Sequence, residues 1–354
     1  MPGLRPIEDW TPPMNGNSVH RFSNTAVVAV QTADASRVVT SDAFDDALAD
    51  TYRRVGLRPG LLERLAGIRE RRWWADGVSY TDGAAMAGDK AISESGVDPG
   101  EIGVMINTSV SRRYLEPSSA VAVHHALGLP RSCQNFDVTN ACLGFVNGME
   151  LSAAMIDSGL VDYALIVNGE DSRPVQERTI DQLNRPETVS RDVVSQFATL
   201  TLGSGAVAMV LGRADAHPEG HRLVASASRA GTEHHELCTG DNDGMHTDLK
   251  GLLDAGLELS SQLWAAAGEE FDWAQGMDRY VMHQVSKVHT QAMCDRFDVD
   301  PALVPTTFPT RGNLGPASVP FTLAREQDSL VDGDRVLLMG IGSGLNVSCL
   351  EIAW

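Results

Sequence analysis

The chain has 354 residues, and 28 basic residues against 47 acidic ones give it a formal net charge of −19. That charge excludes general binding of nucleic acid, because most of the surface would repel phosphate, although a local basic cluster can still hold one anionic small ligand. Hydrophobic residues at 43% and charged residues at 21% are typical of a globular protein, and the length allows two domains or one duplicated domain.

Cysteine usage and the N-terminal sequence both indicate the cytoplasm. The cysteines form no CxxC pair and no zinc spacing, which favours a reducing compartment over a disulfide framework; they are Cys133, Cys142, Cys238, Cys294 and Cys349. Residues 1–9 lack the apolar core of a signal peptide. No run approaches the roughly 18 apolar residues needed to cross a bilayer. We therefore expect a cytoplasmic protein without a membrane span.

Strand and helix patterns alternate after an irregular, proline-rich arm over about 1–23. The clearest strand covers 102–108, a nearly all-apolar run that is typical of a strand buried on both faces. The other expected elements here are strands over 25–30, 163–168 and 206–211 and helices over 41–55, 82–95 and 118–127. This alternation predicts an α/β layered fold with a largely parallel sheet.

A similar order of elements begins near residue 249. A helix over 249–267 leads to a strand over 279–282, a helix over 285–297 and two closing strands around a glycine turn. We therefore predict two halves, 1–215 and 216–354, although the identity between them is too weak to prove duplication. The polar segment 172–196 predicts an irregular lid in the first half.

Three histidines in the polar segment 233–248 raise the question of a metal site. His234, His235 and His246 fit no tight ligand spacing. A surface loop is favoured, and we predict no metal.

The segment 67–74 is the densest basic and aromatic patch in this acidic chain. Arg69, Arg71 and Arg72 can pair with phosphates, and the Trp73 indole can stack on a base. The alternative is a solvated charge run beside core tryptophans.

The segment 137–148 has the pattern of a nucleophile elbow. A short strand ends before it, a helix with regular apolar spacing begins near Cys142, and Ala141 and Gly144 leave room for a substrate carbonyl. The positive end of the helix dipole would favour the thiolate of Cys142. The alternative is a small buried hydrophobic residue.

Polar residues occupy equivalent places at turns after other buried strands. His283 and Asn313 follow such strands, and in α/β sheets these turns gather at one crevice. Together with Cys142 they suit a thiolate nucleophile with two hydrogen-bond donors for a thioester oxygen. The 342–344 turn can add the backbone N–H of Ser343 to that of Cys142 as an oxyanion hole.

These motifs resemble the thiolase superfamily, specifically the ketoacyl synthase III-like condensing enzymes. They are Asn140-Ala-Cys142, His283-Gln284, Gly312-Asn313 with Pro316-Ala-Ser318, and Gly342-Ser-Gly344. The resemblance implies two similar fused halves in a five-layered αβαβα arrangement, a homodimer and a Cys–His–Asn site. It also implies that segment 67–72 lies near the coenzyme A site, which makes Arg69, Arg71, Arg72 and Trp73 candidate contacts.

One position indicates which members of this family the chain resembles most. In Ser111-Arg-Arg-Tyr-Leu-Glu-Pro-Ser-Ser119, Glu116 stands where decarboxylating members usually have an apolar residue. The matching loop reaches the neighbouring subunit's acyl pocket, so Glu116 is a candidate base there. The alternative is a solvent-facing loop acid. His283-Gln-Val-Ser286 also departs from the family's usual His-Gln-Ala-Asn.

This arrangement is similar to the thiolases of long-chain olefin biosynthesis that condense two fatty acyl-CoAs head to head. It implies that Cys142 takes the first acyl group, that Glu116 removes an α-proton from the second acyl-CoA, and that His283 and Asn313 stabilise the enolate. No metal or redox cofactor is expected. The alternatives are a decarboxylating synthase that uses a malonyl thioester, a hydroxymethylglutaryl-CoA synthase-like enzyme, and a non-catalytic thiolase partner subunit.

Overall fold

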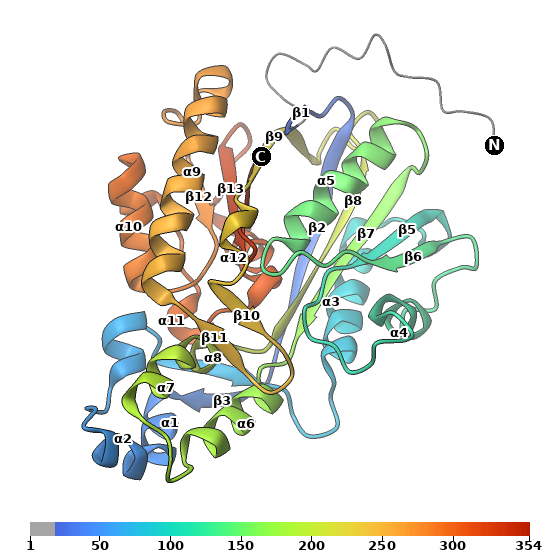
Figure 1. The fold of residues 1–354 in the computed structure, drawn as a ribbon. Coiled ribbons are helices and arrows are strands. Elements are labelled where there is room, and N and C mark those ends of the chain that lie inside the picture. Colours follow the sequence, from blue (N-terminus) through green and yellow to red (C-terminus); the bar gives the residue numbers. More distant parts are fainter. Residues whose placement is uncertain (1–17) are drawn as a thin grey trace, which may run out of the picture.

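The computed structural model describes residues 18–354, apart from the side chains of residues 268 and 269. The prediction of no signal peptide and most of the predicted N-terminal arm lie outside this range. One mixed sheet runs through the molecule in the order β12-β13-β14-β9-β2-β8-β7-β5-β6, with β1 (Val19–Arg21) added beside β9 (Figure 1).

The strands of the sheet fall into two sets along the chain. The first set is β2 (Thr25–Asp34), β5 (Ile102–Asn107), β6 (Gln134–Asp137), β7 (Tyr163–Glu170) and β8 (Gly205–Arg213). The second set is β9 (His221–Ala230), β12 (Arg279–Met282), β13 (Arg335–Gly342) and β14 (Asn346–Ala353). The boundary predicted between residues 215 and 216 falls in the connection from β8 to β9.

The two sets repeat one pairing scheme. In the first, β5 is parallel to β7, β7 is antiparallel to β8, and β8 is antiparallel to β2. In the second, β12 is parallel to β13, β13 is antiparallel to β14, and β14 is antiparallel to β9. The prediction of two similar halves is confirmed by this match. The prediction of a largely parallel sheet is wrong, because most neighbouring strands in the sheet as a whole run antiparallel.

Helices form three layers around the two sets of strands (Figure 1). Outside the first set lie α3 (Tyr80–Ser95) and α4 (Ser119–Ala126), and outside the second lie α9 (Leu249–Phe271) and α10 (Lys287–Phe297). Between the sets lie α5 (Gly144–Asp157) and α12 (Ser318–Glu326). The strands alternate between these layers: Val104 and Ile106 pack in the middle core, and Met105 packs in an outer one. The five-layered αβαβα thiolase arrangement is therefore confirmed.

A smaller cluster packs beside the first half. It contains β3 (Arg37–Thr40), β4 (Glu70–Trp73), α1 (Ser41–Ala47), α2 (Ala49–Val55), α6 (Arg173–Leu183), α7 (Ser190–Ser195) and α8 (Phe197–Thr201). The prediction that 172–196 is irregular is wrong, because Leu183 and Val193 give α6 and α7 buried anchors in this cluster. Segment 233–248, predicted as a loop, contains the hairpin β10 (Cys238–Gly240) and β11 (Met245–Thr247).

The predicted absences concern a membrane span and a metal site. Within residues 18–354, no helix combines the length and apolar character that a bilayer crossing requires. Over the same residues, no group of three or more His, Cys, Asp or Glu side chains is arranged to hold a metal ion.

Candidate active site

Cys142 lies in a tight turn between β6 and α5. Val138 donates its N–H to the Asn107 carbonyl, which holds the start of the turn beside β5. Ala141 has φ of 45°, a left-handed conformation that is uncommon for a residue with a side chain. The helix begins two residues after Cys142, at Gly144. The predicted elbow is therefore present, with a constrained residue directly before the thiol.

The surroundings of the Cys142 thiol favour its neutral form. Burial, with smaller contributions from Cys238 and Glu170, raises its pKa to about 12. In the free subunit, this burial acts against the thiolate that the helix dipole was expected to favour. If Cys142 is the nucleophile, its thiol must therefore lose the proton as it attacks.

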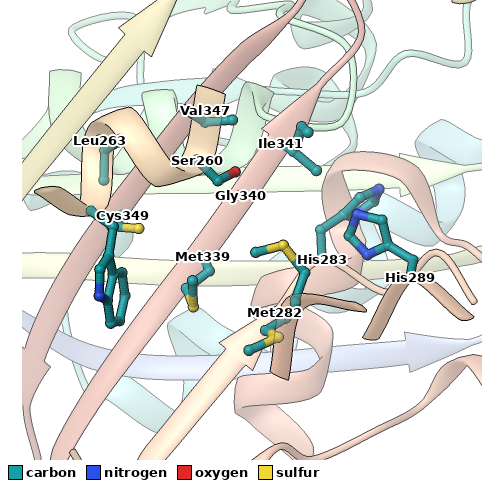
Figure 2. Close-up of a pocket in the computed structure, with 12 residues that line it drawn as sticks. Ser260, Leu263, Met282, His283, His289, Met339, Gly340, Ile341, Val347 and Cys349 are labelled. Carbon is teal, nitrogen blue, oxygen red and sulfur yellow. The ribbon is translucent and has the colours of Figure 1, made fainter. Parts of the chain in front are cut away.

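His283 lies directly after β12 and is only 3% exposed. Its backbone N–H donates to the Met339 carbonyl on β13 at 2.9 Å. Burial, with a smaller contribution from His289, lowers the pKa of its imidazole to about 3. His283 and His289 line one cavity (Figure 2), and within the described chain the Nδ1 atom of each is buried without a hydrogen-bond partner. At neutral pH, His283 is therefore an uncharged group that can donate or accept one proton.

We expect folding stability to fall as the pH drops from 6.5 towards 4. The folded chain holds the pKa of His283 near 3 and that of His289 near 4, both below the ordinary value of 6.5. At these two histidines the unfolded chain therefore binds protons that the folded chain does not, so the stability that they contribute is complete above pH 6.5 and is lost below it. Denaturant unfolding at a series of pH values measures this slope.

The variant His289→Asn should flatten the slope, and the same change at the exposed His235 is the matched control. If the slope of stability against pH is unchanged in His289→Asn, this residue does not contribute to the pH dependence.

Asn313 is held by both its backbone and its side chain. Its N–H donates to the Thr201 carbonyl at 2.9 Å, and its Oδ1 accepts from Gly315 N–H at 2.9 Å and from Ser318 Oγ at 3.3 Å. These contacts fix the orientation of the amide, so that Nδ2 is its remaining donor. Gly312, at φ of 69°, allows the sharp approach, since a Cβ there would lie 2.7 Å from the Thr201 carbonyl oxygen.

The glycine turn that contains Ser343 packs against the Cys142 segment. A Cβ on Gly342 would lie 2.7 Å from the Asn140 carbonyl oxygen and 3.3 Å from Leu143 N. Asn346 Nδ2 also donates to Asn140 Oδ1 at 3.3 Å. The closing hairpin of the second half thus lies directly beside the nucleophile turn of the first. Ser343, whose backbone N–H is a candidate for the oxyanion hole, is partly exposed at this junction.

Glu116 lies at the exposed tip of the loop between β5 and α4. Its neighbours Tyr114 and Leu115 are 57% and 91% exposed. Two large apolar side chains and a carboxylate therefore project together from this subunit.

Of the four candidate coenzyme A contacts, two are at least partly exposed and two are buried. Arg69 is exposed and Arg72 is partly exposed beside Glu70, to which it donates at 2.8 Å. Arg71 is fully buried and donates to Ser41 Oγ and to the Leu200 carbonyl. Trp73, only 8% exposed, donates through Nε1 to Gln176 at 2.7 Å. Alternate residues of β4 point into the core, and this burial counts against Arg71 and Trp73 as coenzyme A contacts.

Substitutions of two of these arginines should separate binding from stability. Arg71→Ala leaves the Leu200 carbonyl unpaired and opens a cavity, so it should lower the melting temperature by about 5 °C or more without a specific change in KM. Arg69→Ala should leave the melting temperature within about 1 °C and raise KM for an acyl-CoA several-fold. Calorimetry and initial rates measure both; a KM effect confined to Arg71→Ala would reverse these assignments.

Sequence reasoning missed Glu170 at this site. Glu170 ends β7 and is 7% exposed, and burial raises its pKa to about 7. A Cβ on Gly315 would lie 3.9 Å from its Cδ, so it borders the Asn313 segment. An acidic residue that ends an otherwise apolar strand was the available signal.

The comparisons with known proteins agree with this geometry. The chain matches the family model for 3-oxoacyl-[acyl-carrier-protein (ACP)] synthase III over residues 136–231 and the model for its C-terminal part over 274–354. The acyl-CoA:acyl-CoA alkyltransferase of Xanthomonas campestris pv. campestris is 42% identical over 336 residues, which cover 94% of this chain and 99% of the relative.

Two further comparisons extend the match. The Shewanella oneidensis protein of the same name is 33% identical over 349 residues, covering 94% of this chain and all of the relative (100%). A crystal structure of Xanthomonas campestris OleA with bound lauric acid and lauroyl-CoA matches with a TM-score of 0.92 at 41% identity, covering 94% of this chain and 100% of that one. This chain therefore belongs to the 3-oxoacyl-ACP synthase III family of thiolase-fold acyltransferases, among its OleA-like condensing enzymes.

Proposed function

We propose that the protein joins two fatty acyl-CoAs head to head, without decarboxylation, and releases a β-keto acid. The observation that carries this proposal is Glu116, an exposed carboxylate on a loop that also projects two apolar side chains. A carboxylate is needed where no CO2 loss generates the carbanion. The relatives named as acyl-CoA:acyl-CoA alkyltransferases support the same reaction class.

The first half of the reaction transfers an acyl group to Cys142. The sulfur attacks the thioester carbonyl, and the N–H groups of Cys142 and Ser343 hold the oxyanion. The carbon–sulfur bond to coenzyme A breaks, and the proton lost by Cys142 leaves on the coenzyme A thiol. Arg69 and Arg72 are the candidate contacts for its phosphates.

The second half forms the carbon–carbon bond. Glu116 of one subunit enters the site of a second copy in a homodimer and removes the α-proton of the incoming acyl-CoA. Neutral His283 and Asn313 Nδ2 donate hydrogen bonds to the enolate oxygen. The enolate carbon attacks the acyl-cysteine carbonyl, and the bond between the acyl carbon and the Cys142 sulfur breaks. The sulfur takes up the proton that Glu116 removed, which returns Glu116 to its carboxylate form.

Release of the product completes the cycle. We also propose that the protein is cytoplasmic. Hydrolysis of the 2-alkyl-3-ketoacyl-CoA gives the β-keto acid and coenzyme A. Each step moves protons and acyl groups only, so we propose that the enzyme uses no metal or redox cofactor.

Incubation with a single long-chain acyl-CoA, without a malonyl donor, tests the proposal. We expect coenzyme A release and a product whose mass corresponds to two joined acyl chains, as the β-keto acid or its ketone. If the enzyme acylates once and stalls until malonyl-CoA is added, it is a decarboxylating synthase, the alternative supported by the matching family models. A reaction that requires acetoacetyl-CoA would instead indicate a hydroxymethylglutaryl-CoA synthase-like enzyme.

If Cys142 forms no acyl-enzyme, the protein is a non-catalytic partner subunit, and the condensation proposal fails.

A further inference from the structure

The loop that carries Glu116 is anchored at its N-terminal end, its first root, by the buried carboxylate of Glu170. Oε1 of Glu170 accepts from Val110 N–H at 2.8 Å. Oε2 accepts from Ser111 N–H at 3.0 Å and from Ser111 Oγ at 2.6 Å. Ser111 Oγ in turn accepts from Asp171 N–H at 2.9 Å, which ties the root of the loop to the end of β7. Both oxygens of one carboxylate therefore hold two consecutive residues of the loop.

A second carboxylate holds the other root. Oδ2 of Asp137, the last residue of β6, accepts from Ser119 N–H and from Arg112, each at 3.0 Å. Oδ1 accepts from Ala120 N–H at 2.9 Å and from Asn107 Nδ2 at 3.0 Å. Because β6 and β7 flank β5, the two carboxylates hold the loop from opposite sides of the strand that leads into it.

The tip between these roots has exposed side chains, so its direction depends on the roots. Charge-assisted hydrogen bonds to a buried carboxylate are stronger than neutral ones and restrict the backbone on which they act. A general base must lie within hydrogen-bond distance of the proton it removes, and a displacement of about 1 Å costs about 10²-fold in rate.

We propose that Glu170, with Asp137, is a positioning residue for Glu116: it fixes the root of the loop so that the tip reaches the partner's site in the geometry needed for condensation. This inference rests on the proposed function. It assigns Glu170 to the second half-reaction, although Glu170 lies in the same subunit as Cys142, whose pKa it helps to raise.

The test separates the two half-reactions in Glu170→Gln. The glutamine has the same shape, but its amide presents N–H groups to a site where every partner is a donor, so at least one anchor is lost. We expect acylation of Cys142, followed by intact mass, to stay within about 3-fold of wild type, while condensation falls about 10²-fold. Ser111→Ala removes only the Oγ anchor and should give a smaller loss in the same direction; it also serves if Glu170→Gln does not fold.

Asp157→Asn is the matched control, because Asp157 also accepts from two backbone N–H groups, of Ser23 at 2.7 Å and Asn24 at 2.9 Å, but at the far end of α5. It should lower stability without changing the ratio of condensation to acylation. The double variant Glu170→Gln/Glu116→Ala should condense no more slowly than Glu116→Ala alone, because a positioning residue acts through the group it positions.

Three outcomes would overturn the inference: losses that multiply in the double variant, an equal loss of acylation and condensation in Glu170→Gln, or a wild-type ratio in Glu170→Gln while Glu116→Ala is inactive. Full condensation by Glu116→Ala is a different result, because it would refute the base in the proposed function itself.

Discussion

Subunits that carry Cys142→Ala, mixed with subunits that carry Glu116→Ala, should recover condensation that neither variant shows alone. Each variant by itself should lose at least about 10³-fold, since one lacks the nucleophile and the other the base. In a mixed homodimer, one site combines an intact Cys142 with an intact Glu116 from the other chain. Random exchange makes half of the dimers mixed, each with one working site, so about a quarter of wild-type activity should return.

The control mixes wild-type subunits with the double variant Cys142→Ala/Glu116→Ala in the same ratio. If Glu116 acts across the interface, these mixed dimers are inactive, because the intact Cys142 faces a partner without Glu116. If Glu116 acts within its own subunit, they keep one working site and the first mixture recovers nothing. Coenzyme A release and product mass, measured after subunit exchange, therefore distinguish the two arrangements.

Asn313→Asp should acylate Cys142 and then fail to condense. The carboxylate keeps the two contacts that Oδ1 accepts, from Gly315 N–H and Ser318 Oγ. It replaces the Nδ2 donor with an acceptor, which repels the enolate oxygen instead of stabilising it. Loss of one such donor costs about 10²–10³-fold, and the added charge should place this variant at or beyond the upper end.

Ser318→Ala is the milder companion, because it removes one of the contacts that orient the amide and leaves the donor in place. Its condensation should fall by about 10-fold or less. Equal losses of acylation and condensation in Asn313→Asp would assign the residue to the first half-reaction. Single-turnover acylation and steady-state condensation give the two rates.

Much of the fold was predictable because its signals are local. Apolar runs marked the central strands, and the same order of elements marked the two halves. Strand direction was not predictable in this way, since β2, β7 and β8 pair across long stretches of chain and their register depends on tertiary packing. The helices of 172–196 were missed because their apolar spacing is weak: α6 buries the polar Gln176 and Thr179 beside Leu183.

The turns that carry Cys142 and His283 were predictable, because each follows a strand. The strand expected before Asn313 is absent from the described residues, and the helix α11 (Phe308–Arg311) stands there instead. The arginine cluster was not predictable, because no strand was predicted over β4. Once that strand is recognised, a period of two places Arg71 and Trp73 on one face and Arg72 on the other. The surroundings of Cys142 also needed the fold, because the burial that raises its pKa comes from residues distant in sequence.

The middle helix layer has a consequence for biosynthesis. Helix α12 comes from the second half of the chain, yet it packs on β2 and β8 of the first half. While the ribosome is still making residues before 318, the inner face of the earlier sheet lacks part of its apolar cover. We therefore expect the nascent N-terminal half to bind chaperones until nearly the whole chain has been translated. Ribosome-stalled chains that end before α12 should bind more chaperone than chains that include it.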